Sequence, residues 1–340
     1  MKSIILLALF CFATVGFELA LARHSNLHEW EQYKRQHGKV YETPEEDSSR
    51  FSLFLAAKER VAQHNANDQA SYKMSLNHLS DWTPEESAML NGFRHDSLEP
   101  AKLIKTSNQR QYLKALKRAS NVTIPDEIDW RKVPNRVTAV KDQGKCASDW
   151  AFATTGTLEG QMVNTEAKRK QLVPLSEQQL IDCSKLNRGC HGGNMAIALD
   201  YISSVGGIES EKNYPYIGTD NETCKSDKSK FVMTADGADE RDDTEDQLKF
   251  TVAIVGPVAT ALRANDNLKH YKSGIFTDPN CGFHLDHAVL IVGYGTDPTV
   301  GEYWIVKNSW SSSWGENGYF RIKRGDCGIG NLFVVPWRPQ

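Results

Sequence analysis

Residues 143–152 read Gln-Gly-Lys-Cys-Ala-Ser-Asp-Trp-Ala-Phe, and the rest of the chain is best understood outward from them. Apolar and small side chains recur at helical spacing from Trp150 onward, which predicts a helix over residues 150–161. Asp149 is then expected in the first helical turn, where free N–H groups and the positive end of the helix dipole favour a negative group. An aspartate is also an ordinary residue at such a position, so the helix alone assigns it no chemistry.

This stretch resembles the signature of the papain-like cysteine peptidases, a Gln-Gly-x-Cys-Gly-Ser-Cys-Trp run that carries two cysteines. The resemblance implies that Cys146 is the structural cysteine and that Asp149 occupies the position of the nucleophile. A carboxylate is a far poorer nucleophile toward an amide than the thiolate that this position normally holds. We therefore expect the fold of the family, in its cathepsin L-like branch, without the reactive sulfur.

Two further motifs resemble the remainder of the family's catalytic site. His287 lies in Leu-Asp-His-Ala-Val-Leu-Ile-Val, similar to the strand of the catalytic histidine, and Asn308 lies in Lys-Asn-Ser-Trp, similar to the motif that orients this histidine. The resemblance implies that Trp310 shields their hydrogen bond. It also implies that Gln143 donates to an oxyanion, together with the backbone N–H of residue 149. A lone histidine before a strand is usually structural, but the order and separation of these motifs favour the catalytic position.

The resemblance also assigns residues to a peptide-binding cleft. Gly192 and Gly193 match the loop whose backbone pairs with an extended peptide, and Trp314 belongs to a retained Trp-Gly pair. An apolar pocket for the side chain two residues before a cleavage point would be lined by Met195, Ala261, Leu285 and Leu332. An ordinary core role is an equally open interpretation of these four residues.

Three more positions depart from the family pattern. Ala147 and Ser311 replace motif glycines, and His191 replaces an asparagine. A glycine can be required where the backbone adopts positive φ or where another chain approaches closely. The first two departures therefore put the fine geometry of the cleft in question.

The cysteine count agrees with the loss of a nucleophilic thiol. Residues 1–22 indicate a secretory signal, with a charged start, an apolar run too short for a membrane span and a small-residue cleavage site. Removing Cys11 with this signal leaves six of the seven cysteines, an even set with no thiol left over. Spacing leaves many pairings open; the resemblance implies Cys146–Cys190, Cys183–Cys224 and Cys281–Cys327.

The residues before this domain resemble the propeptide of the cathepsin L branch. Glu46, Arg50, Phe54, Val61 and Asn65 match its spaced helical pattern, with Ala57 in place of the first asparagine, and Ser75, Asn77, Leu79 and Asp81 partly match its second motif. The resemblance implies a segment that occludes the cleft of its own mature domain. Three segments are expected: a signal peptide (1–22), an inhibitory propeptide with a processing linker at 99–120 (23–120), and a papain-like peptidase domain (121–340).

The expected fold class is α+β. Helical patterns dominate up to about residue 230, and β-branched and aromatic runs then predict strands at 288–292, 303–307 and 318–323. The resemblance gives this order a two-lobed, papain-like architecture, with a helical N-terminal lobe, a β-rich C-terminal lobe and a cleft between them.

The function expected from these features is that of a pseudopeptidase of the secretory pathway, extracellular or lysosomal. Its partners would be peptides or proteins in the cleft and its own propeptide, with peptidase inhibitors and other peptidases as further candidates. A net charge of -3 gives no reason to expect nucleic acid or membrane binding, and no cofactor or metal is expected. Asn121 and Asn221 begin sequons and are candidates for glycosylation.

Two alternatives stay open. In the first, the chain is an active endopeptidase in which Asp149 and His287 activate water. Such chemistry ordinarily uses two carboxylates, and nothing in the sequence directs the neighbouring Asp286 toward Asp149. In the second, the chain is a structural or storage protein that merely retains the fold.

Overall fold

The structure is a computed structural model that describes residues 24–95, 123–162, 171–220, 223–241 and 244–336. The expected signal peptide, the linker at 99–120 and both sequon asparagines, Asn121 and Asn221, lie outside the described residues.

Helices predominate in the first part of the described chain, and strands predominate in the last part. The helices are residues 24–37, α2 (Pro44–Asn65), α3 (Pro84–Ala88), α5 (Asp149–Gln161), α6 (Glu177–Cys183), α7 (Met195–Val205), α8 (Glu245–Val255) and α9 (Asp266–Lys269). The strands are β1 (Tyr72–Met74), β2 (Ile128–Asp129), β3 (Ile208–Glu209), β4 (Phe231–Met233), β5 (Ala238–Arg241), β6 (Val258–Leu262), β7 (Tyr271–Phe276), β8 (His287–Asp297), β9 (Gly301–Lys307), β10 (Tyr319–Lys323) and β11 (Phe333–Pro336). Short 3₁₀ turns include η3 (Gly189–His191).

The larger sheet contains strands from the N-terminal part of the described chain, such as β1, and from its C-terminal end, such as β11. Its strand order is β1-β7-β10-β9-β8-β6-β11-β5, with β2 on β8, and only the β7–β10 pair among these is parallel. Strand β8 has the longest run of buried residues, because β6, β9 and α5 all pack around it. The first residue of β8 is His287, so the sheet fixes the backbone of this side chain.

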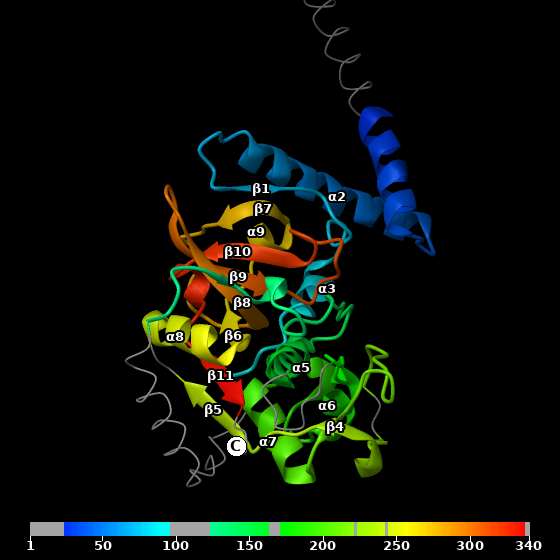
Figure 1. Ribbon diagram of the computed structural model, residues 1–340. Coiled ribbons are helices and arrows are strands. Elements are labelled where there is room, and N and C mark those ends of the chain that lie inside the picture. The colour runs from blue at the N-terminus through cyan, green and yellow to red at the C-terminus, as the bar shows by residue number, and fades with distance from the viewer. Residues whose placement is uncertain (1–23, 96–122, 163–170, 221–222, 242–243, 337–340) are drawn as a thin grey trace, which may run out of the picture.

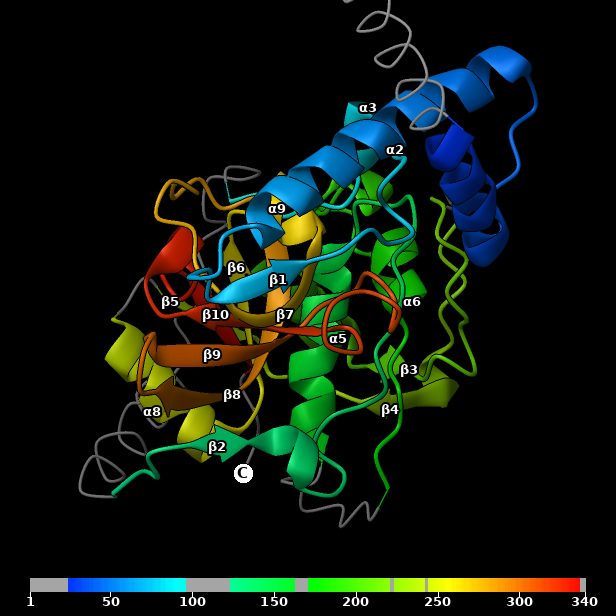
Figure 2. The same cartoon turned by 90° about the horizontal axis from the view of Figure 1, so that it is seen from above.

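Helix α5 lies between the sheet and the helical lobe, as Figure 2 shows. It begins at Asp149, which confirms the expected place of this residue in the first turn. Burial extends around almost the whole helix rather than along one face. Two glycines make this possible, because a Cβ at Gly156 would lie 2.8 Å from Leu290 and one at Gly160 would lie 2.8 Å from Pro257.

The two lobes have separate apolar cores. Trp150, Leu158 and Leu199 belong to the core of the helical lobe, whereas Trp304 and Phe320 belong to that of the β-rich lobe. The expected α+β layout, a helical lobe followed by a β-rich lobe, is confirmed.

Residues 24–74 form a third body at one end of the molecule, next to β7 and α9 (Figure 1). Their two long helices cross around a small aromatic core of Trp30, Tyr33 and Phe54. Asn65 exchanges two hydrogen bonds with the backbone of Met74, at 2.8 and 3.0 Å. Asn65, one of the residues that match the propeptide pattern, therefore links α2 to β1.

Three disulfides close loops within the two lobes. They join Cys146 to Cys190, Cys183 to Cys224, and Cys281 to Cys327, the pairing that the resemblance implied. Within the described ranges, no helix has the length and apolar character needed to cross a membrane.

Candidate active site

Asp149 is fully buried where the two lobes and residues 89–95 meet, and its carboxylate is saturated with donors. Oδ2 accepts hydrogen bonds from the backbone N–H of Gly92 (3.0 Å) and Ala288 (2.9 Å) and lies 2.7 Å from Nδ1 of His287. Oδ1 accepts from the N–H of Trp150 at 2.7 Å. The helix end and the start of β8 thus supply N–H groups that hold a negative charge in a buried place.

His287 bridges Asp149 and Asn308. Its Nε2 lies 2.9 Å from Oδ1 of Asn308, and the N–H of Ser309 also donates to that oxygen at 2.9 Å, which fixes the orientation of the amide. Nδ1 faces a carboxylate oxygen that already accepts two backbone N–H groups. Because both ring nitrogens face acceptors, the geometry fits a doubly protonated imidazolium paired with a carboxylate. The ring stacks on Trp310 with centroids 4.7 Å apart, so Trp310 covers this side of the pair.

The other candidate groups for hydrolysis are engaged elsewhere. The carboxylate of Asp286 accepts from Arg263 and from the N–H of Ala264 (2.8 Å), and burial raises its pKa. The hydroxyl of Ser148 lies 2.9 Å from that of Tyr216. Neither group is therefore arranged as a partner or a substitute for Asp149 in this structure.

Gln143 faces the backbone of the residues that precede Gly92. Its Nε2 donates to the carbonyls of Met89 (3.2 Å), Leu90 (3.3 Å) and Cys146 (3.0 Å). Ser309 donates to its Oε1 at 2.6 Å, which fixes the amide so that the donor faces the cleft. The side chain for which an oxyanion-donor role was expected thus donates here to carbonyl groups of the chain's own N-terminal part.

Residues 89–91 form the turn that ends α3, and residues 92–94 then pair with the cleft through their backbone. The N–H of Gly193 donates to the carbonyl of Gly92 (2.9 Å), and the N–H of Arg94 donates to the carbonyl of Gly193 (2.8 Å). The N–H of Phe93 donates to the carbonyl of Asp286 at 3.0 Å. The loop expected to pair with an extended peptide therefore pairs with this segment, while Gly192 beside it has a φ of 110°.

The residues assigned to an apolar pocket and Phe93 belong to one buried apolar cluster. Phe93 is 3% exposed and belongs to the buried cluster that includes Met195, Ala261, Leu332 and, partly buried, Leu285. In this structure the four residues therefore belong to the core cluster that also contains Phe93.

The departures from the family pattern have different local consequences. Ser311 has a φ of 72°, in the left-handed region that favours glycine, whereas Ala147 is buried with its N–H bonded to the carbonyl of Cys190. Trp314 is fully buried and packs edge-on to Trp310, with centroids 5.1 Å apart. The wall behind His287 is thus intact although Ser311 takes a conformation that suits glycine.

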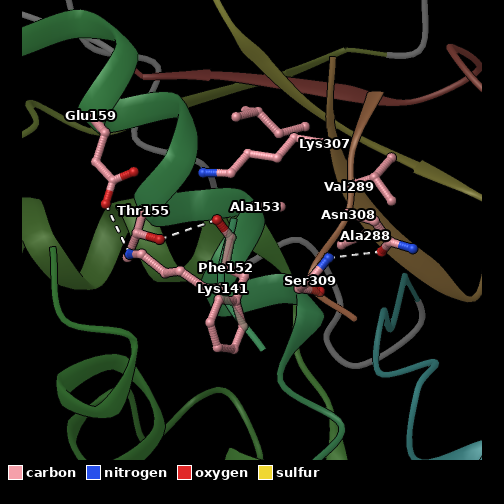
Figure 3. Close-up of a pocket in the computed structure, with 11 residues that line it drawn as sticks. Lys141, Phe152, Ala153, Thr155, Glu159, Ala288, Val289, Lys307, Asn308 and Ser309 are labelled. Carbon is pink, nitrogen blue, oxygen red and sulfur yellow. Dashed lines mark hydrogen bonds and ion pairs between the residues drawn. The ribbon is translucent and has the colours of Figure 1, made fainter. Parts of the chain in front are cut away.

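A network of buried charged side chains lies behind Asn308, and it was not predicted from the sequence. It surrounds a cavity of about 20 Å³ (Figure 3), and Lys141 there binds Glu159 at 2.9 Å and also Glu177. Burial raises the pKa of Glu177 and lowers that of Lys307 to about 8. The available signal was the presence of glutamates in apolar surroundings on two successive helices.

Sequence reasoning also missed the path of residues 89–95. No periodic pattern marks this stretch, and its fit depends on contacts with residues far along the chain. A Gly-Phe pair shortly after the propeptide motifs was the one local signal.

Two family matches cover most of the chain. Residues 124–337 match the papain family cysteine protease, and residues 30–87 match the cathepsin propeptide inhibitor domain. The first match contains both lobes and the site around Asp149, and the second contains α2 and β1.

Relatives match this chain along most of their length. The chain is 39% identical over 320 residues to cathepsin L of Sarcophaga peregrina, covering 91% of this chain and 92% of that one. It is 38% identical over 353 residues to procathepsin L of Mus musculus, covering 99% of each. The solved structure of the digestive procathepsin L2 proteinase from Tenebrio molitor larval midgut matches with a TM-score of 0.81 and 35% identity, covering 92% of this chain and 100% of that one.

Proposed function

The chain belongs to the papain family of cysteine proteases, and we propose that it is a cathepsin L-like member that binds peptides or proteins in its cleft without cleaving them. The observation that carries the proposal is the environment of Asp149. This residue sits at the start of α5, 2.7 Å from His287, where the family motif places the nucleophilic cysteine. A carboxylate that already accepts four hydrogen bonds is a poor nucleophile toward an amide.

The charges of the site support binding as the retained activity. A carboxylate beside an imidazolium reproduces the charge arrangement of a thiolate–imidazolium pair without a reactive sulfur. Every cysteine in the described ranges is held in a disulfide, so no thiol there can take over the reaction. The cleft accepts an extended backbone through Gly193 and Asp286 and an aromatic side chain in its apolar pocket.

The proposal includes a route through the secretory pathway. Residues 1–22 would be removed as a signal, three disulfides suit an oxidising compartment, and the final location would be extracellular or lysosomal. Without its own activity, the chain depends on another peptidase to cut the linker at 99–120. Glycans at Asn121 and Asn221 belong to the same proposal.

A single experiment scores binding and cleavage together. The purified full chain is cut by an added cysteine peptidase, which is then quenched with a thiol-directed inhibitor before a broad peptide library is added. The inhibitor has no target among the disulfide-bonded cysteines described here. The proposal predicts that peptides are retained and recovered intact.

The control is a His287→Ala variant carried through the same steps, which reports any peptidase that escapes quenching. Cleavage at a defined bond by the wild type, above this background, would overturn the proposal and favour an active endopeptidase. A sample in which peptides are neither cut nor retained would overturn it in favour of a structural or storage role.

A further inference from the structure

A hollow lies where α2 meets α9, at the junction of the N-terminal part and the β-rich lobe. The two helices are next to each other in both overall views (Figures 1 and 2). This α2–α9 hollow is lined by residues of α2, of the stretch 80–87 and of the stretch 266–270. Its volume is about 390 Å³, within the range of about 300–1,000 Å³ that is usual for small-molecule sites. A molecule bound there contacts both parts of the chain at once.

One face of α2 forms a wall of the α2–α9 hollow. Four residues at spacings of three and four line it, which places them on one side of the helix: Leu53, Ala56, Ala57 and Arg60. The two alanines have small side chains, which leave space beside the helix. Trp82, which is 9% exposed, adds an aromatic side chain to the lining. Because most of the lining is apolar, the hollow favours a ligand with an apolar body.

Ala57 is the residue at which the propeptide-like pattern of this chain departs from asparagine. An asparagine there would place a carboxamide at the wall of the hollow, and its NH₂ group would supply two hydrogen-bond donors. Alanine supplies neither the volume nor the donors. The substitution therefore leaves more space in the hollow and removes donors from its lining.

The imidazole of His270 supplies a buried acceptor at the same hollow. His270 belongs to the lining and is 2% exposed, and burial lowers its pKa to about 4, so the ring is neutral at mild pH. Its Nδ1 lies 2.9 Å from the backbone carbonyl oxygen of Asp266, so Nδ1 is the nitrogen that carries the proton. Nε2 is then an acceptor, and it has no hydrogen-bond partner among the described residues. A buried acceptor without a donor is unfavourable, so a ligand that donates to Nε2 gains affinity.

The charged groups of the lining are paired with one another. A carboxylate oxygen of Asp266 lies 3.5 Å from a guanidinium nitrogen of Arg60, and the other lies 3.3 Å from Nζ of Lys269. Lys269 also donates to the hydroxyl of Ser87 at 3.1 Å. A charged ligand would have to compete with these pairs, whereas a neutral ligand leaves them intact. The hollow therefore favours a neutral ligand.

We propose that the α2–α9 hollow binds a small neutral molecule with an apolar body and one O–H or N–H donor, and that this donor binds Nε2 of His270. Because the lining belongs to both parts of the chain, the molecule binds only while residues 24–95 are docked, and it stabilises the docked form. The inference goes beyond the proposed function and does not depend on it, because the lining of the hollow does not include Asp149.

The test uses the uncut full chain near neutral pH with two probes of nearly the same shape, phenol and toluene. Phenol carries an O–H donor, and toluene carries a methyl group in its place. The ¹⁵N resonance of Nε2 of His270 is followed by NMR in a chain labelled with ¹⁵N-histidine, and the His270→Gln variant identifies it by its loss.

Phenol should move this resonance upfield and saturate, because an unprotonated ring nitrogen that accepts a hydrogen bond becomes more shielded. Toluene should not move it in this direction, since it has no donor. The matched variant is Ala57→Asn, which narrows the hollow and brings donors of its own. We expect it to weaken phenol binding about tenfold or more, whereas Ser52→Asn, at an exposed position of α2 outside the lining, should bind phenol like the wild type.

A second readout is the stability of the uncut chain in urea. At a phenol concentration about ten times its Kd, the equilibrium constant for unfolding should fall about tenfold, because phenol binds the folded chain alone. This gain should be seen as a raised urea midpoint in the wild type and in Ser52→Asn, and it should be lost in Ala57→Asn. The readout also covers the case in which a variant changes the baseline stability, since each chain is compared with itself.

Four outcomes would overturn the inference. Phenol that fails to saturate the shift of Nε2, or that binds Ala57→Asn as tightly as the wild type, would show that the α2–α9 hollow is not its site. The same upfield shift with toluene would show that no donor is required. A resonance that has the position of a hydrogen-bonded nitrogen before phenol is added, and that stays there afterwards, would mean that water alone binds Nε2.

Discussion

Residues 24–95 contact the rest of the chain at two places, and the interactions at the two places differ in kind. At the first, the β7 contact, β1 extends the sheet beside β7, and the backbone of Lys269 and His270 accepts hydrogen bonds from Asn77 and Ser75, each at 2.9 Å. At the second, the cleft contact, the backbone of residues 92–94 bonds to Asp149, Asp286 and Gly193.

The two contacts differ in whether they include the side chain of residue 149. The β7 contact is made of strand pairing and apolar packing distant from the site, so it forms whichever residue stands at that position. The cleft contact includes the side chain of Asp149 directly. A change at residue 149 can therefore weaken the cleft contact and leave the β7 contact unchanged.

The largest effect is expected from removing the acceptor of the cleft contact. Asp149→Ala leaves the His287 ring and the N–H groups of Gly92 and Ala288 buried without this carboxylate. We expect the free energy of unfolding of the full chain to fall by about 3–5 kcal/mol, measured by urea denaturation.

The matched control is Asp246→Ala, which removes a carboxylate that is 88% exposed and paired with Arg324 at 2.9 Å. Exposed pairs contribute about 0–1 kcal/mol. If Asp149→Ala costs no more than Asp246→Ala, the cleft contact does not depend on the buried carboxylate as described.

The next largest effect is a loss of stability at low pH through His270, whose backbone takes part in the β7 contact. Burial lowers the pKa of His270 to about 4, with Asp266, Lys269 and Arg60 as the charged groups that face it. Between this value and the ordinary pKa of about 6.5, the unfolded chain binds a proton that the folded chain does not. Stability should therefore be lost as the pH falls through this range, by on the order of 2 kcal/mol from this group.

Unfolding of the wild type and of His270→Gln, compared across the same pH range, measures this contribution. The variant should lose part of the pH slope, because glutamine does not titrate. A variant with the full wild-type slope would show that the acid sensitivity of the β7 contact comes from other groups.

The smallest effect is expected in the loop that contains Ser311. Ser311 has a φ of 72°, so Ser311→Gly relieves backbone strain of about 1–2 kcal/mol, part of which is offset by the greater freedom of glycine in the unfolded chain. We expect a gain of about 0.5–1 kcal/mol in the free energy of unfolding, seen as a raised urea midpoint. Ser313→Gly in the same loop should give no gain, and a similar gain in both variants would refute the strain.

Local patterns predicted much of this fold. The apolar spacing after Trp150 predicts α5, and β-branched runs predict the strands that begin near Ala288 and Tyr303. Motif resemblance placed His287 and Asn308 in order along the chain, and the structure brings them within 2.9 Å of each other. These features can be predicted because they depend on residues that are close in sequence or on short, distinctive sequence motifs.

The environment of Asp149 could not be predicted in the same way. Its Oδ2 forms hydrogen bonds with Gly92, His287 and Ala288, which lie 57, 138 and 139 residues away along the chain. A single sequence does not specify that these residues converge. The burial of Phe93 among residues of both lobes has the same origin. The sequence placed Asp149 in the first turn of a helix, whereas its hydrogen bond to Gly92 could be seen only in the fold.

The most direct test of the account is whether the precursor can cut itself. The purified full chain and its Asp149→Cys variant are held at mildly acidic pH without any added peptidase, and their masses are followed with time. The account predicts that the wild-type chain keeps its full length. Asp149→Cys should shorten itself at least partly, because a thiol there lies beside His287 at the start of α5. A wild-type chain that shortens, and that no longer does so when His287 is changed to alanine, would contradict the account.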